Sequence, residues 1–332
     1  MNSDLTATST RRRLLGVAAG ATGVALAATV LHPAQAAAAT PGGGPSTASA
    51  GGVRGTTSSG LFALELGTVQ QGFVHSADGG DTYADVVRVG GQKHIGPIKY
   101  DDFSINFGFG MGQEFERWVV EAVAQNGSRR DGTLLATDFT RTVKSARAFH
   151  QALITKLTIP ACDASSRTQG SLALTFAAQT ATDVVWTGTL TGSPSQQKTW
   201  LPSNFRLEIN GLDCTRVSKI EAITMTAAPN VDGTPTFEFP NLAITFAAST
   251  LSSWKTWFDA FIVSGTVEKS GTLTLLAANR TELAVLRFNN VGIFRLDPDP
   301  ESATADTIVK ARAELYVGGM RFTKLGSYTP TT

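Results

Sequence analysis

The sequence has little charge, little cysteine and little histidine, and these shortages exclude several classes of protein. Lys, Arg, Asp and Glu make up 17% of its 332 residues, against about 25% in an ordinary soluble domain. The formal net charge of +1 excludes a strongly basic nucleic-acid-binding protein. With only two cysteines, Cys162 and Cys214, the chain cannot hold a disulfide framework, a four-cysteine zinc site or a cysteine-ligated iron–sulfur cluster.

The chain is long and rich in glycine. Its 33 glycines, with few lysines and many threonines and valines, favour a β-rich architecture. At roughly 100–200 residues per domain, the length allows about two domains that each bury a core. Outside an apolar run at 14–30, no segment has the length and hydropathy of a transmembrane helix.

Residues 1–36 have the layout of an export signal, in which a basic cluster precedes an uncharged run and a cleavage site. The run at 14–30 is rich in alanine and glycine. The basic cluster and the two small residues that signal peptidase accepts are Arg11, Arg12 and Arg13, and Ala34 and Ala36. Residues 37–60, rich in Gly, Ala, Ser, Thr and Pro, are predicted to be a flexible tether.

The paired arginines resemble a twin-arginine signal. Gly16 stands where that pattern often has lysine, so the general secretory route remains open. An uncleaved anchor is disfavoured because the run is shorter than the about 20 strongly apolar residues of a spanning helix. We therefore predict that the twin-arginine route exports the chain to the periplasm, the cell surface or the medium. No transmembrane anchor is expected after cleavage.

The segment after the tether contains an internal repeat. Short motifs recur at one constant offset of 139 residues, which chance rarely preserves across strands, a helix and turns. The positions that show this offset are Asp102 and Asn241, Phe115 and Trp254, Gly132 and Gly271, and Phe149 and Phe288.

Each copy predicts several strands and one helix. Apolar and polar residues alternate along 61–75 and 83–107, and a helix-like segment follows the glycine cluster at 108–112. Predicted strands resume at 132–145, 147–159 and 170–177, with counterparts at 271–277, 283–296 and 309–317. The apolar faces of the two helices are Phe115, Trp118, Val119, Ala122 and Val123, and Trp254, Trp257, Phe258, Phe261 and Ile262.

These patterns predict a mainly β fold with flanking helices. The economical architecture is two tandem antiparallel β-barrel or sandwich modules, each carrying one amphipathic helix. Module 1 is predicted at 61–178 and module 2 at 205–326. The connector at 179–204 is rich in Trp and Thr, so part of it could pair as a strand.

Module 1 carries a series of short motifs in a fixed order between residues 61 and 177. They are Phe62-Ala-Leu-Glu-Leu66, Gly72-Phe73, Gly79-Gly80, Lys93-His-Ile-Gly96, Lys99-Tyr-Asp-Asp102, Asp131-Gly132, the run from Arg147 to Ile154, and Pro160-Ala-Cys-Asp-Ala-Ser-Ser166. In this order the motifs resemble contractile phage tail-tube proteins, a family that includes the tubes of bacterial contractile injection systems. Module 2 lacks the Lys-His-Ile-Gly and Asp-Ala-Ser-Ser motifs and matches mainly through its similarity to module 1.

The resemblance implies a non-enzymatic structural protein. Tail-tube subunits form rings whose inner wall is a continuous β-barrel, and the rings stack into a hollow tube. Neighbouring subunits pair the open sheet edges. Three two-module chains could then make a ring with pseudo-sixfold symmetry. Tube or sheath components are implied as further partners.

The export signal departs from that family, whose members assemble in the cytoplasm. It suggests a module that acts outside the cytoplasmic membrane. We expect an exported structural protein that self-assembles into rings or tubes. The alternative is a secreted two-domain binding module that uses the tube fold without polymerising.

No catalytic, cofactor or metal site is predicted. The sequence lacks Gly-x-Ser-x-Gly, His-Glu-x-x-His, Cys-x-x-Cys and the P-loop. We interpret His94 and His150 as structural histidines and 108–112 as a strand-to-helix turn rather than a phosphate loop. The carboxylates at 297–301 lack the EF-hand spacing for calcium and are interpreted as an exposed acidic loop.

Two features leave alternatives open. The aromatic stripe on the second predicted helix, Trp254 to Phe261, could bind a partner, but residues at this spacing usually face a core. Cys162 and Cys214 lie in different modules and could form a disulfide outside the cytoplasm.

Overall fold

The computed structural model describes residues 60–192, 198, 200–229, 235–298 and 309–331. These residues are mainly β, with two α-helices, α1 (Gln113–Val123) and α2 (Leu251–Ser264). This confirms the predicted mainly β fold with flanking helices. The predicted export signal and the tether up to residue 59 lie outside the described residues.

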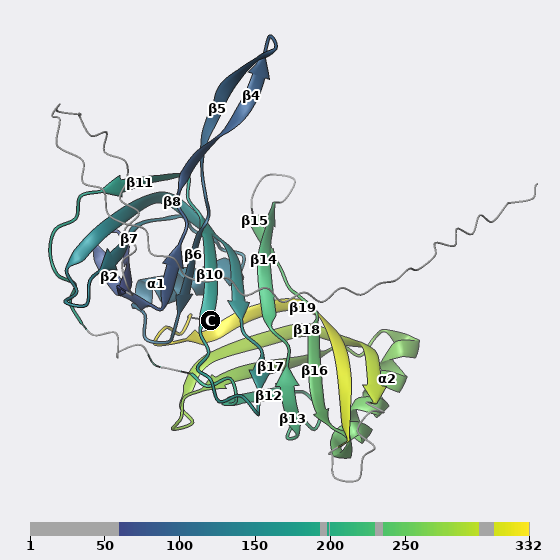
Figure 1. Ribbon diagram of the computed structural model, residues 1–332. Coiled ribbons are helices and arrows are strands. Elements are labelled where there is room, and N and C mark those ends of the chain that lie inside the picture. The colour runs from purple at the N-terminus through teal and green to yellow at the C-terminus, as the bar shows by residue number, and fades with distance from the viewer. Residues whose placement is uncertain (1–59, 193–197, 199, 230–234, 299–308, 332) are drawn as a thin grey trace, which may run out of the picture. The chain divides into compact units, whose positions relative to one another are not determined.

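Module 1 forms an antiparallel sheet in the order β2-β1-β7-β8-β10-β6-β3, and β11 also pairs with β8. A separate two-stranded sheet, β4 with β5, extends away from it (Figure 1). The strands are β1 (Phe62–Leu66), β2 (Val69–Val74), β3 (Ser76–Asp78), β4 (Thr82–Val89), β5 (Gln92–Tyr100), β6 (Phe103–Phe107), β7 (Arg130–Thr137), β8 (Val143–Ile159), β9 (Cys162–Asp163), β10 (Leu172–Ala177) and β11 (Thr180–Val184).

Module 2 forms a second antiparallel sheet in the order β12-β17-β18-β19-β16-β13, to which β9 of module 1 adds at one edge. Its hairpin of β14 and β15 instead joins the sheet of module 1, where β14 pairs with β8. The strands are β12 (Phe205–Ile209), β13 (Val217–Ile220), β14 (Ile223–Pro229), β15 (Pro235–Glu238), β16 (Leu242–Ala247), β17 (Lys269–Leu276), β18 (Glu282–Pro298) and β19 (Lys310–Leu325).

The two modules share one strand order and one register. The series β1-β7-β8-β10-β6-β3 corresponds element by element to β12-β17-β18-β19-β16-β13. Phe62 pairs with Ala136 in module 1, and at the equivalent position of module 2 Phe205 pairs with Leu275. The repeat found in the sequence is therefore a repeat of hydrogen-bonded structure.

The modules differ in length between β3 and β6. Ala77 on β3 pairs with Ile105, and Ile220 on β13 pairs with Ile244. The first members of these pairs are 143 residues apart, whereas the second members are 139 apart. Module 1 therefore has four more residues in its hairpin, β4–β5, than module 2 has in β14–β15.

Unusual backbone conformations also recur at equivalent positions. Arg141 and Arg280 both have φ 67°, and Gln151 and Asn290 both have φ 52°. Non-glycine residues seldom adopt positive φ, so the coincidence reflects one backbone course used twice. Gln151 and Asn290 lie at equivalent register shifts in the pairing of β7 with β8 and of β17 with β18.

Each helix packs its aromatic side chains against its own sheet. The rings of Trp118 and Phe176 lie 5.5 Å apart, and those of Trp254 and Phe246 lie 4.5 Å apart. The aromatic stripe of α2 is thus part of the core, as expected, with Phe258 half-buried. Ile262, which the helical spacing also placed on the buried face, is exposed.

Several strand boundaries differ from the predicted ones. The run at 61–75 is divided by a turn at Gly67, whose φ of 59° suits glycine. The run at 132–145 is also divided, because Asp138 Oδ1 accepts the backbone N–H groups of Thr140 and Thr142 and closes a turn. β19 continues to Leu325, beyond the predicted end at 317.

Candidate assembly surfaces

The two modules are joined by an exchange of strands. β14 of module 2 pairs with the C-terminal half of β8, where Met225 faces Leu157. In return, β9 of module 1 pairs with β13, where Cys162 faces Ile220. All four side chains are buried. We call this pair of contacts the internal seam.

The hairpin of module 2 also contacts the end of α1. Gln125 Nε2 donates to the carbonyl of Phe237 on β15 at 2.9 Å, and the N–H of Phe237 donates to Gln125 Oε1 at 2.7 Å. Phe237 and the nearby helix residue Val123 are both buried in the common core. The seam therefore combines strand pairing with an apolar anchor.

A third contact in the seam involves a buried carboxylate. Glu116 on α1 accepts hydrogen bonds from the N–H and hydroxyl groups of Ser327 and from the N–H of Tyr328. Burial raises the pKa of Glu116, and the hydrogen bonds from Ser327 and Tyr328 oppose that rise. The carboxylate fastens the end of module 2 to the helix of module 1.

The hairpin of module 1 has no comparable partner. Among the described strands, β4 and β5 pair only with each other. Its cross-strand apolar pairs, Val86 with Ile95 and Ala84 with Ile98, lie on a ribbon that Figure 1 shows projecting from the module. Val86, Ile95 and Ile98 are all exposed. A concentrated apolar surface of this kind marks a contact site more often than chance exposure.

The root of this hairpin is a glycine pair with positive φ. Gly79 and Gly80 have φ values of 97° and 77°. A Cβ on Gly79 would collide with the carbonyl oxygen of Asp102, and one on Gly80 with the ring of Phe103. The equivalent residues of module 2 are Ala222 and Ile223, at the start of β14. The two hairpins therefore begin with different backbone conformations, since neither Ala222 nor Ile223 has positive φ.

The long strand of module 2, β18, has an edge that no described strand covers beyond Val291, although α2 packs against β18. In module 1, β7 and then β14 line one edge of β8, while β11 and β10 line the other. In module 2, β17 pairs with β18 only as far as Val291, and β19 lines the opposite edge. Within the described part of the chain, no strand pairs with 293–298 on the β17 side. We call this stretch the free edge.

Among the described strands of module 1, none pairs with the outer edge of β3. In module 2, β13 lies between β16 and β9, whereas in module 1 β3 is the last strand of its sheet. The residues equivalent to β9 in module 2 are 301–302, which lie outside the described residues.

The end of α2 is apolar and uncovered. Ile262 and Val263 on the helix and Val267 after it are exposed. The module 1 equivalent of Ile262 is Val123, which is buried beside the β14–β15 hairpin. The contrast shows that this helix face is covered where the internal seam exists and bare where it does not.

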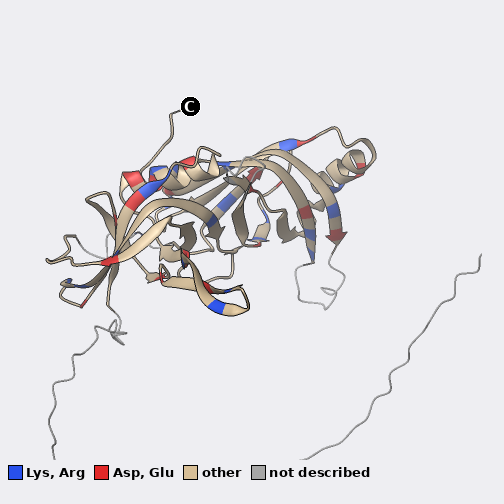
Figure 2. Ribbon diagram, turned by 90° about the horizontal axis from the view of Figure 1, so that it is seen from above, with Lys and Arg blue, Asp and Glu red and all other residues tan. Residues whose placement is uncertain are grey.

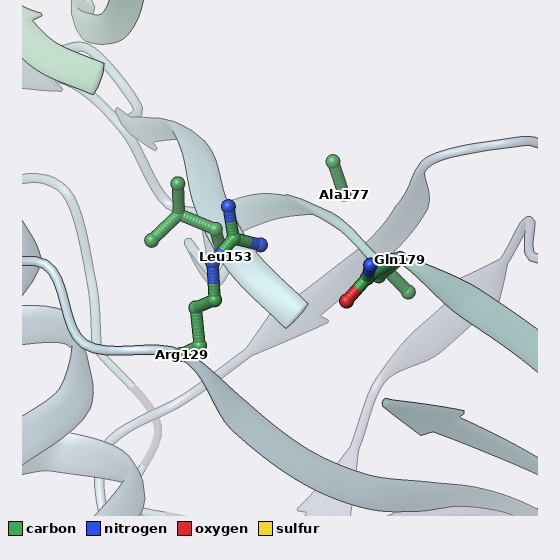
Figure 3. A pocket seen from close by; sticks show the side chains of 5 residues that line it. Arg129, Leu153, Ala177 and Gln179 are labelled. Atoms are coloured by element: carbon green, nitrogen blue, oxygen red, sulfur yellow. The ribbon is translucent and has the colours of Figure 1, made fainter. Parts of the chain in front are cut away.

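A pocket of about 440 Å³ lies in module 1. Figure 3 shows the Arg129, Leu153, Ala177 and Gln179 side chains around it, and Ala178 completes the lining. These side chains provide one guanidinium but no nucleophile and no carboxylate. They cannot supply general acid–base or nucleophilic chemistry by themselves.

Module 2 fills the equivalent space with a tyrosine. Tyr316 stands at the position of Ala177, and its hydroxyl donates to Glu268, the counterpart of Arg129, at 2.7 Å. Gly292 replaces Leu153, and a Cβ there would strike the Tyr316 ring. The pocket is thus a difference in packing between two copies of one fold.

The two histidines interpreted from the sequence as structural are on the surface. His94 lies on β5, and His150 Nδ1 is 3.6 Å from Asp131 Oδ2. No group of three or more His, Cys, Asp and Glu side chains that could hold a metal ion occurs in the described segments. Of the acidic stretch at 297–301, Asp297 pairs with Arg295, and the residues beyond Pro298 lie outside the description.

The glycine cluster at 108–112 leads into α1, as interpreted from the sequence. Gly112 is the N-cap residue. The side-chain oxygen of Gln71 accepts the N–H of Phe115 at 3.1 Å. A Cβ on Gly112 would collide with that Gln71 side chain. A side chain of β2 therefore occupies the position where a phosphate would have to bind.

In the structure both cysteines are free thiols, whereas the sequence left a disulfide between Cys162 and Cys214 open. Cys162 is buried in β9, and burial raises its pKa to about 12. Cys214 is half-buried, and burial raises its pKa to about 11. Neither thiol is activated as a nucleophile.

The charges are dispersed. Figure 2 shows short blue and red segments scattered along a ribbon that is mostly tan. Among the described helices, neither is long and apolar enough to cross a membrane.

Comparison with known proteins finds similarity of structure but not of sequence family. No profile of a known protein family matches the chain, and no curated protein matches it. Among solved structures it is similar to a chain in the cryo-EM structure of the anti-feeding prophage baseplate, symmetrised sixfold. The identity is 14%, the match covers 38% of this chain and 95% of that chain, and the TM-score is 0.29. A similarity of this size leaves the function to be argued from the surfaces described above.

Proposed function

We propose that this chain is an exported, non-enzymatic structural protein that self-assembles into rings or tubes. The observation that carries the proposal is the β4–β5 hairpin, an apolar ribbon without a partner in the described part of the chain. Its counterpart, β14–β15, is packed into the sheet of module 1. One hairpin therefore has a docking site within the chain, and the other needs a docking site elsewhere.

The open sheet edges support the same proposal. Edge strands with unpaired N–H and C=O groups invite pairing with another chain, and natural proteins protect them or use them. Here the internal seam uses such edges to join the two modules. A protein that already joins one copy of its fold to another in this way has the means to add further copies.

The resemblance to tail-tube proteins supports rings as the form of assembly. Three chains would supply six copies of the fold and give pseudo-sixfold symmetry. Stacked rings would form a tube, and sheath-like components are candidate partners. The low charge of the modules suits subunits that cover much of their surface with neighbours.

Export through the twin-arginine route is part of the proposal. It is supported by Arg11 and Arg12 ahead of the uncharged run and by Ala34 and Ala36 after it. Replacing Arg11 and Arg12 with lysine should leave the protein in the cytoplasm, as cell fractionation would show. Unchanged export of that variant would contradict the twin-arginine route.

A secreted binding module is the second candidate. The observation in its favour is the pocket beside Arg129, which module 2 fills with Tyr316. Size measurement separates the two candidates. Light scattering and negative-stain images of the purified protein should show rings or tubes at micromolar concentration. A monomer at every concentration would contradict self-assembly and leave the binding module.

A further inference from the structure

We propose that the β4–β5 hairpin of one copy docks on module 2 of a second copy, against the free edge of β18 and the exposed end of α2. The proposal rests on the proposed self-assembly and names its two surfaces. We call the free edge, 293–298, together with Ile262 and Val263 the receiving face. The internal seam is the template, because it joins the equivalent surfaces within one chain.

The elements that meet in the internal seam have equivalents on the two proposed surfaces. In the internal seam, β14 pairs with β8 through residues 156–159. The repeat places Arg295 to Pro298 at the equivalent positions of β18, within the free edge. The element equivalent to β14 is β4, because Tyr83 pairs with Lys99 as Thr226 pairs with Glu238. Each module therefore has a hairpin and a long-strand edge that can pair with a hairpin. The internal seam uses the hairpin of module 2 and the edge of module 1. The hairpin of module 1 and the edge of module 2 have no such partner in the described part of the chain.

Residues buried in the internal seam have exposed equivalents on the two proposed surfaces. Phe237 on β15 is 5% exposed, whereas its equivalent Ile98 on β5 is 63% exposed. Val123 at the end of α1 is 1% exposed, whereas its equivalent Ile262 on α2 is 56% exposed. The covered residues Phe237 and Val123 thus have equivalents, Ile98 and Ile262, that are also apolar but exposed. Burying these counterparts against each other would remove apolar surface from water on both copies.

The outer edge of β3, which no described strand covers, belongs to the same module as the hairpin. In the internal seam, the chain that follows β8 returns through β9 to cover the edge of β13. The equivalent edge of β3 is uncovered within the described part of module 1. The hairpin and the uncovered edge of β3 both belong to module 1, and the receiving face belongs to module 2. The contact is therefore head to tail rather than symmetric.

The hairpin root allows the required change of direction. Gly79 and Gly80 occupy the positions of Ala222 and Ile223, which run straight into β14. Glycine reaches both positive and negative φ readily, so the ribbon can turn onto a neighbour's edge without a side chain in the way. Pro298 has no N–H to donate, so the ladder on the receiving face ends there.

A head-to-tail contact closes into a ring when its rotation divides a full turn, and otherwise gives an open helix. If the seam between copies repeats the internal one, all module-to-module steps in the assembly are alike. Three chains then close a ring of six modules.

Two charge substitutions test the contact from its two sides. Ile98→Glu places a carboxylate on the hairpin, and Ile262→Glu places one on the receiving face. Both residues are exposed in the single chain, so the fold should be unchanged by circular dichroism and thermal midpoint. Val185→Glu is the matched control, since Val185 is 96% exposed and module 2 carries Lys324 at the equivalent position.

Each of the two variants alone should be a monomer by light scattering, whereas the control should assemble as the wild type does. Mixed in equal amounts, the two variants should form a dimer of twice the monomer mass and nothing larger. In the mixture, the unchanged hairpin of the Ile262→Glu variant binds the unchanged receiving face of the Ile98→Glu variant. The other hairpin and the other receiving face each carry an added carboxylate, so no further copy binds.

The outcomes separate this inference from the proposed function. If the wild type assembles and either variant alone still forms the same assembly, the named surfaces are wrong although self-assembly stands. If both variants are monomers and their mixture stays monomeric, the head-to-tail pairing is wrong. A wild type that is monomeric at every concentration overturns self-assembly, and the contact with it.

Discussion

Glu116 on α1 and Ser327 near the end of the described chain are joined by two hydrogen bonds. The backbone N–H and the hydroxyl of Ser327 both donate to Glu116 Oε2, at 2.8 and 2.6 Å. The carboxylate is almost completely buried. The segment after β19 thus holds module 2 to module 1 at a point separate from the paired strands, and it does so with a titratable group.

Glu116→Gln should change how stability depends on pH. Burial raises the pKa of Glu116, so the folded chain holds this proton more tightly than the unfolded chain. The stabilisation is fully present below the unfolded pKa of Glu and is lost as pH rises through the higher folded pKa. The free energy of unfolding of the wild type should therefore fall relative to that of Glu116→Gln as the pH rises above the ordinary pKa of a Glu side chain.

Urea unfolding at several pH values measures this difference. Glu114→Gln is the control, because Glu114 lies on the exposed side of the same helix and pairs with Arg117. A constant difference between wild type and Glu116→Gln across the pH range would contradict the prediction.

The indole N–H groups of the two helices make equivalent hydrogen bonds, and their loss should have similar effects. Trp118 Nε1 donates to the carbonyl of Ser128 at 2.8 Å, and Trp257 Nε1 donates to that of Val267 at 2.9 Å. Trp118→Phe and Trp257→Phe each leave one carbonyl without this donor and should destabilise the chain by about 1–3 kcal/mol. Denaturant unfolding followed by circular dichroism is the measurement. A loss under ~0.5 kcal/mol at both sites would count against it.

Gly132 and Gly271 should tolerate no side chain. A Cβ on Gly132 would collide with the carbonyl of Glu65, and one on Gly271 with the carbonyl of Glu208. Alanine at either position should destabilise the chain by about 1–3 kcal/mol, because the paired strand has to move. Gly127→Ala is the matched control, since its Cβ would meet only the Leu153 side chain, at 3.5 Å.

Thermal unfolding of the three alanine variants tests this. The unfolding midpoint of Gly127→Ala should stay close to that of the wild type, because its free energy of unfolding should change by no more than about 0.5 kcal/mol. Equal midpoints for all three variants would show that the glycines are not required by the close approach of the backbone.

The two cysteines should resist alkylation in the folded protein. Burial raises the pKa of Cys162 to about 12 and that of Cys214 to about 11, so little thiolate exists at pH 8. Iodoacetamide should add slowly to the native chain and twice to the chain in urea without reductant. An intact mass with no added group in urea would instead reveal a disulfide.

The sequence predicts the repeat and the type of its elements well. The constant offset appears in the structure as two copies of one strand order. The alternation of apolar residues and the helical spacing of Trp254 and Trp257 are local patterns, and they appear as strands and a helix. Local patterns do not identify which strands pair across the chain. The partner of β14 is a strand that ends more than sixty residues earlier, so the internal seam had no signal in the sequence.

The candidate surface was missed for a related reason. Val86, Ile95 and Ile98 are apolar residues of the types that also fill buried strands, so the sequence predicted strands here and could not predict their exposure. Ile262 likewise shares the helical spacing of its buried neighbours. The exposed residues can be distinguished from the buried ones only by comparing the two modules in the structure, because one hairpin and one helix end are covered there and their equivalents are not. A signal was present in Gly79 and Gly80, which mark where the hairpin leaves its sheet.

The internal seam also affects how quickly an assembly could start. Because β14 and β8 are parts of one polypeptide, this contact forms at an effective concentration in the millimolar range, whatever the protein concentration. A six-module ring then requires three molecules to meet rather than six. Its formation should depend far less steeply on dilution than that of a ring of single modules. Tandem duplication would thus favour assembly at low subunit concentration.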